Sequence, residues 1–148
     1  MRIWTASFKS PEKFTTVSRF YDMIIVPNGI THVIDIRRDY IKSDKFMAPK
    51  LIEEEFRIRH ISYTLLGNYY FNVKDPITYD NLKLLLSEYK EADNATNVIT
   101  RAVAKYNVCL IGSKRKHKQD LRYELAYIIA DRVKDMFNEK LFIMHTGE

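Results

Sequence analysis

Five short apolar or β-branched runs divide the chain and predict five strands. Most of their ends lie beside charged residues or beside Gly, Pro, Ser or Asn, the residue types that end strands and make turns. The runs occupy residues 3–8, 31–36, a segment around 60–63, 108–111 and 141–145. The run at 108–111 passes directly into Gly112-Ser113 and then into a dense basic segment.

Between these runs, apolar residues recur at the three- and four-residue spacing of a helix. This pattern predicts helices that begin at an N-cap Ser10 followed by Pro11, at Pro49, after an N-cap Thr78, at Asp93 and at Asp120. Val98, Ala102 and Val103 are expected to face inward on the fourth of these helices, and Met136 belongs to the apolar stripe of the last.

Strands that alternate with helices indicate an α/β fold. We expect one three-layer, Rossmann-like domain over residues 1–148, with a mostly parallel sheet of about five strands. Right-handed crossovers favour the first strand at the centre, the second and third strands on one side of it, and the fourth on the other. Ligands bind such sheets outside the carboxyl ends of the strands, where the strand order reverses.

Composition is that of an ordinary globular domain, with 46% hydrophobic and 29% charged residues among 148. No apolar run approaches the roughly 20 residues that cross a bilayer. Cys109 is the only cysteine and lies in an apolar run, so we expect a core residue and no internal disulfide. With no signal-peptide pattern at the start, we expect a cytoplasmic location, in host cytoplasm if the gene is viral, as the Tyr-, Lys-, Ile- and Asn-rich composition allows.

The basic segment between the fourth strand and the last helix, residues 114–118, is the most distinctive chemical feature of the sequence. The formal net charge is +5, and this segment places cationic groups beside a helix N-terminus, which attracts phosphate. A solvated loop without a partner is the alternative. The predicted phosphate or nucleic-acid ligands, at this segment and at the ends of the other strands, are Ser7, Arg37, Arg38, Lys45, Ser113, Lys114, Arg115, Lys116, His117, Lys118 and Arg122.

The sequence gives less evidence for catalysis than for phosphate binding. Asp35 and Ser113 are the candidate catalytic residues, but a nucleophilic serine needs a base that the spacing does not identify. Asp35 is better explained as a residue that orients Arg37 than as an acid or base. We expect Arg37 to face the site, with a structural pairing to Asp35 or Asp39 as the alternative. The histidines show no metal-ligand spacing, so we expect no metal and no cofactor.

Aromatic residues follow the third predicted strand in the run Tyr69-Tyr70-Phe71. Exposed rings beside basic groups stack on nucleic-acid bases, and Tyr69 and Tyr70 are the candidates for this role. Packing of these rings beneath a loop is the alternative.

Short motifs along most of the chain resemble the domain of unknown function 488 family. The matching pieces are residues 5–7, 12–14, 35–37, 43–46 with Pro49, and 63–67. The family's later motif, Cys-Ala-Glu and then Cys-His-Arg, corresponds here to 112–114 and 120–122, where only Arg122 is retained. The resemblance implies the same order of strands and helices and again picks out Arg37, but chemistry that uses the family's Cys and His groups is not available to this chain.

These observations favour a protein that binds nucleic acid or a nucleotide through a basic rim, without strong catalysis. Two alternatives stay open: an enzyme that acts on a nucleotide or nucleic acid, and a virus-encoded protein that binds a host protein through a basic and aromatic surface.

Overall fold

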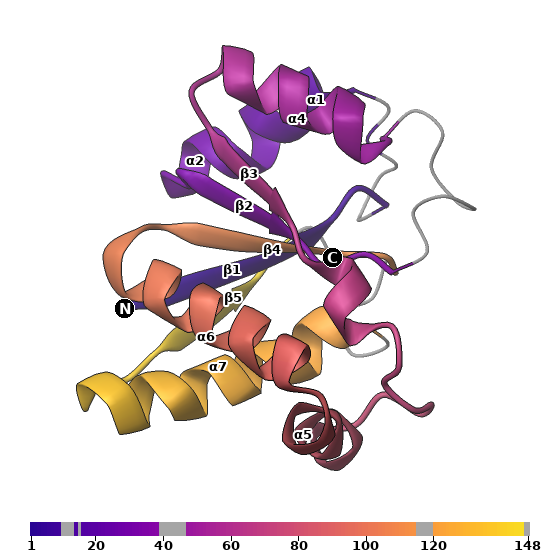
Figure 1. The fold of residues 1–148 in the computed structure, drawn as a ribbon. Coiled ribbons are helices and arrows are strands. Elements are labelled where there is room, and N and C mark those ends of the chain that lie inside the picture. Colours follow the sequence, from indigo (N-terminus) through magenta and orange to yellow (C-terminus); the bar gives the residue numbers. More distant parts are fainter. Residues whose placement is uncertain (10–13, 15, 39–46, 115–119, 147–148) are drawn as a thin grey trace.

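The computed structural model describes residues 1–9, 14, 16–38, 47–114 and 120–146. Its centre is a five-stranded sheet in which all strands are parallel, in the order β3-β2-β4-β1-β5 (Figure 1). The strands are β1 (Arg2–Ser7), β2 (His32–Asp35), β3 (Ser62–Leu65), β4 (Val108–Gly112) and β5 (Phe142–His145). The predicted α/β class and parallel sheet are confirmed.

The predicted strand order is wrong in one respect: β4 lies between β2 and β1 instead of beyond β1. Leu110 of β4 pairs with Ile34 of β2 on one side and with Thr5 of β1 on the other. Handedness decides which face a crossover covers, but it does not decide how many strand positions the crossover skips. The apolar run of β4 is buried along its whole length, which suits a central position with a strand on each side.

Helices cover both faces of the sheet and complete a three-layer arrangement (Figure 1). One layer contains α1 (Val17–Phe20), the π-helical turn η1 (Tyr21–Ile25), α2 (Val26–Asn28) and α4 (Pro49–Ile58). The other contains α5 (Tyr79–Glu88), α6 (Lys90–Lys105) and α7 (Leu121–Phe137). Successive residues of β1 divide between the two cores, with Ile3 facing the α5–α7 layer and Trp4 the opposite one.

The starts of α4 at Pro49 and of α5 after Thr78 agree with the sequence, whereas the cap of α1 was not predicted. Thr78 caps α5, its hydroxyl accepting a hydrogen bond of 3.1 Å from the Asn81 N–H. Thr16 caps α1, which begins at Val17, while the predicted cap Ser10 and its neighbour Pro11 lie outside the described residues.

Several predicted boundaries and facings need correction. The α6 helix begins at Lys90, three residues before Asp93, and its Val98 is 50% exposed instead of buried. Met136 of α7 is likewise exposed. The third strand begins at Ser62 because α4 continues to Ile58 and a turn follows it. Among the described helices, none has the length and apolarity that a membrane crossing requires.

Cys109 lies in β4 with no exposed surface, as the sequence predicts. Burial raises the pKa of its thiol to about 12, and only the thiolate reacts readily with disulfide reagents or alkylators. We therefore expect no reaction with Ellman's reagent in the native protein and release of one equivalent per chain in denaturant. Rapid labelling of the native protein at neutral pH would contradict this burial.

Candidate anion-binding site

The carboxyl ends of the strands bring together residues that are distant in the sequence. β2 and β4 are neighbours, with Asp35 paired with Ile111, so the segments that follow the two strands leave the sheet side by side. The chain after β2 continues to α4 on one face, and the chain after β4 continues to α7 on the other. Connections that diverge from adjacent strands open a crevice between them, which is the usual ligand site of such sheets.

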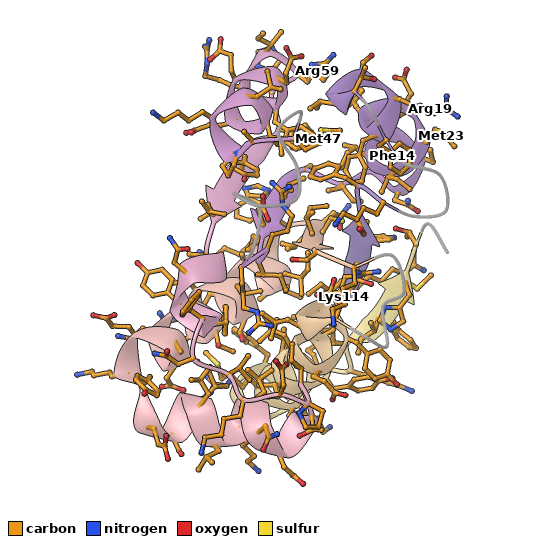
Figure 2. All side chains as sticks on the ribbon, turned by 90° about the vertical axis from the view of Figure 1, so that its right-hand side faces the viewer. Phe14, Arg19, Met23, Met47, Arg59 and Lys114 are labelled. Atoms are coloured by element: carbon orange, nitrogen blue, oxygen red, sulfur yellow. The ribbon has the colours of Figure 1, made fainter. Side chains whose placement is uncertain are left out.

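A cavity of about 190 Å³ lies at this crevice. It is lined by an apolar group and a polar group of side chains: Ile36, Phe71 and Ile77, and Arg38, Ser113, Lys114 and Asp120. Arg38 and Ser113 are half-buried and Lys114 is exposed. Figure 2, which views the molecule from the carboxyl edge of the sheet, shows Lys114 near the centre of this face. We call this cavity the carboxyl-edge cavity.

Three larger hollows differ from the carboxyl-edge cavity in charge. The first, of about 350 Å³, lies over α5, α6 and α7, where three aspartates outnumber Lys83 and Arg132. The second, of about 450 Å³, lies beside α4 and β3, where Lys50 and Glu53 balance each other. The third, of about 230 Å³, lies beside α6, where Glu91 is the charged lining residue. The carboxyl-edge cavity has two cations and one carboxylate, so it is the one of these four that favours an anion.

Arg37 does not reach the carboxyl-edge cavity, because it forms a buried ion pair with Asp35. Its Nη2 donates to Asp35 Oδ2 at 2.7 Å and its Nε donates to Oδ1 at 3.0 Å, while Nη2 also donates to the Met47 carbonyl at 2.8 Å. The guanidinium lies 5.1 Å from the centre of the Phe8 ring. With Arg37 1% and Asp35 0% exposed, the predicted phosphate contact of Arg37 is corrected to the structural pairing that the sequence left as its alternative.

Asp35 is held by two further donors. The backbone N–H of Arg37 donates to its Oδ1 at 3.0 Å, and the Tyr63 hydroxyl donates to its Oδ2 at 2.6 Å. Burial, and next the carboxylate of Asp35, raise the pKa of Tyr63, so this hydroxyl stays protonated and remains a donor. The arrangement fits a carboxylate that orients Arg37, and it leaves Asp35 without the access to substrate that an acid or base needs.

A second buried pair, Asp120 with Arg122, borders the carboxyl-edge cavity. Arg122 Nη1 donates to Asp120 Oδ2 and, at 2.7 Å, to the Lys114 carbonyl, while the Lys114 N–H donates to the same Oδ2 at 3.1 Å. Burial raises the pKa of Asp120, and the Arg122 guanidinium opposes that rise. A Cβ on Gly112 would lie 1.9 Å from Asp120 Oδ2, so a glycine at the end of β4 admits the pair. Arg122 therefore fixes the backbone of Lys114 instead of contacting a ligand itself.

The residues predicted to bind phosphate or nucleic acid thus fall into three groups. Arg38, Ser113 and Lys114 line the carboxyl-edge cavity. Ser7, Arg37 and Arg122 lie at the same edge but are at most 1% exposed, and Ser7 Oγ accepts a hydrogen bond from the Lys9 N–H at 3.1 Å. The third group lies outside the described residues and consists of Lys45, Arg115, Lys116, His117 and Lys118.

The three aromatic residues after β3 also differ in exposure and in the cavity that they border. Tyr70 is fully buried and its hydroxyl bonds to Thr96 Oγ1 at 2.9 Å, so the prediction that its ring is open for stacking is wrong. Tyr69 is 45% exposed but borders a different hollow, beside α6. Phe71, which the sequence did not single out as a stacking residue, is 69% exposed and lines the carboxyl-edge cavity. The 3-10 turn η2 (Gly67–Tyr70) rotates these consecutive side chains to different sides.

No group of three or more His, Cys, Asp or Glu residues in the described part of the chain has the arrangement of a metal site. The comparisons with known proteins add no family: neither protein-family models, nor curated proteins, nor solved structures give a match to this chain.

Proposed function

We propose that this protein binds nucleic acid or a nucleotide, with a phosphate group in the carboxyl-edge cavity. The observation that carries the proposal is the presence of Arg38 and Lys114, from two segments 76 residues apart in sequence, in the lining of one cavity at the end of the sheet. Guanidinium and ammonium groups are the side chains that bind phosphate oxygens most strongly.

The surroundings of these two cations support an anionic ligand. The Asp120 carboxylate is neutralised by Arg122, so Arg38 and Lys114 give the cavity a positive charge. The 17-residue helix α7 begins directly after Asp120, and the positive end of its dipole therefore lies beside the cavity. The Ser113 hydroxyl adds a group that can donate a hydrogen bond to a phosphate oxygen.

Binding without strong catalysis is the better supported form of the proposal. Asp35 accepts hydrogen bonds from Arg37 and Tyr63 and is fully buried, so it is committed to holding the fold together. Contacts of the remaining cavity residues would be to phosphate and would carry little sequence information.

Arg38→Ala and Lys114→Ala test this proposal through the salt dependence of binding. We expect each variant to bind a labelled single-stranded oligonucleotide about tenfold more weakly at low salt, because each loses a charge-assisted contact. Each should also reduce the slope of log K against log salt concentration by about 0.7, the value for one phosphate contact with a single strand. Fluorescence anisotropy titrations over a series of salt concentrations measure both quantities.

Arg101→Ala and Lys105→Ala are the matched controls. Both residues are exposed on α6, and Lys105 is the last residue of that helix, at the opposite edge of the sheet. They remove the same charges from the molecule without touching the carboxyl-edge cavity. Equal losses in all four variants would show a response to net charge alone and would overturn the proposed site.

A further inference from the structure

We infer that the ligand of the carboxyl-edge cavity is single-stranded nucleic acid, with one unpaired base stacked on Phe71. The inference rests on the proposed function and adds to it the class of nucleic acid. Its basis is the position of an exposed aromatic ring in the lining of the same cavity as the two cations.

Phe71 is presented to solvent from a well-anchored piece of backbone. The preceding residue, Tyr70, is buried and hydrogen-bonded to Thr96 of α6, and the Phe71 N–H donates to the Asn68 carbonyl at 3.4 Å. Two residues later, Val73 is buried in the core that α5, α6 and α7 form against the sheet. The Phe71 ring is therefore exposed, while Tyr70 before it and Val73 two residues after it are buried in that core. A flat apolar surface held in this way is a platform on which a base can stack.

The cavity has an apolar part and a cationic part, which complement the base and the phosphate of a nucleotide. Phe71, Ile36 and Ile77 supply the apolar part, and Arg38 and Lys114 supply the charge. A base offers an apolar π-face and its phosphate offers the negative charge. Inorganic phosphate or a simple polyanion would use only the cationic part and would leave Phe71 exposed.

Size and geometry favour an unpaired nucleotide over a duplex. The volume of about 190 Å³ lies below the roughly 300–1,000 Å³ of pockets that enclose a whole small-molecule ligand, so the cavity fits part of one nucleotide and not a base pair. In a duplex, neighbouring base pairs already cover both faces of every internal base. A base reaches an aromatic side chain only where the strand is unpaired, as in single strands, loops and ends.

The test compares three labelled probes of about 12 nucleotides: a single strand, the same sequence as a hairpin duplex without overhangs, and a strand with abasic sites throughout. We expect the wild-type protein to bind the single strand most tightly. Phe71→Ala should weaken binding of the single strand about 5- to 150-fold, the range for loss of one stacked base. Phe71→Trp should retain the wild-type affinity, because it keeps an aromatic ring at this position.

The abasic strand separates stacking from a structural role of Phe71. Because that probe has phosphates but no bases, Phe71→Ala and the wild type should bind it equally. Tyr69→Ala is the matched control, because Tyr69 is an exposed aromatic of the same segment that borders another hollow. It should bind the single strand as the wild type does.

The possible failures are distinct. If the wild type binds none of the probes, the proposed binding of nucleic acid is wrong and the inference falls with it. If the hairpin binds as tightly as the single strand, or if Phe71→Ala weakens binding of the abasic strand as well, the inference is wrong while phosphate binding by Arg38 and Lys114 remains.

Discussion

Replacement of Arg37 by alanine is expected to lower the free energy of unfolding by about 3–5 kcal/mol, the usual loss when one partner of a buried ion pair is removed. The variant leaves the Asp35 carboxylate fully buried with no counter-charge, and it also removes the guanidinium that packs over the Phe8 ring. For a domain of this size, such a loss lowers Tm by roughly 10 °C or more. Urea denaturation followed by circular dichroism measures the change.

Two controls distinguish the loss of the pair from the loss of a charge. Arg57→Ala removes an arginine that pairs with Glu54 on the exposed face of α4, and it should leave the urea midpoint unchanged. The double variant Asp35→Leu/Arg37→Met replaces both charges with apolar groups, and it should recover most of the lost stability. A single Arg37→Ala variant that unfolds at the wild-type urea concentration would contradict the structural role assigned to this pair.

Gly67→Ala is expected to destabilise the protein by about 3 kcal/mol, at the upper end of the usual cost of overpacking. A Cβ at this position would lie 2.0 Å from the carbonyl oxygen of Arg37 and 2.7 Å from its carbonyl carbon. These are backbone atoms of the segment that follows β2, so they cannot rotate away as the end of a side chain can. The added methyl group must push the end of β2 away from the turn that follows β3, and this displaces the Asp35–Arg37 pair as well.

Gly29→Ala is the matched control for Gly67→Ala. Gly29 has φ of 62°, and a Cβ there would meet only the Asn107 amide at 3.6 Å, an ordinary contact. Its expected cost is about 1 kcal/mol, from the left-handed backbone alone. Urea denaturation of the two variants side by side gives the comparison, and a Gly67→Ala variant no less stable than Gly29→Ala would contradict the close approach.

The alternation of strands and helices could be predicted from sequence, because apolar spacing reports the period of each element. The order of the strands could not, since the pattern within β4 shows that it is buried but not which strands flank it. The burial of Arg37 had a signal in the sequence. Asp35 and Arg37 are two residues apart at the end of a strand, where alternate side chains share a face, and this spacing supports the pairing that the sequence left only as the alternative.

The sequence does not predict which of two adjacent residues with similar side chains is buried. Arg37 turns into the protein and Arg38 lines the carboxyl-edge cavity, although both follow β2 directly. Tyr70 is buried and Phe71 is exposed for a comparable reason: the partner that buries Tyr70 is Thr96, which is 26 residues away on α6. Contacts between distant segments decide such cases, and a local pattern does not contain them. Ligand contacts in the basic run 115–118 and the resemblance to the domain of unknown function 488 family stay predictions.

The place of β1 in the sheet has a consequence for how the chain reaches its native state. Both strands that flank β1 come from the last third of the sequence: Ile3 pairs with Val108 on one side and with Ile143 on the other. During synthesis, β2 and β3 can meet as soon as residues 32–65 are made, whereas the first strand has no native neighbour until β4 emerges from the ribosome. Pairings across more than 100 residues carry a large entropy of loop closure, so folding is expected to be slow and to be completed only after β5 has been synthesised.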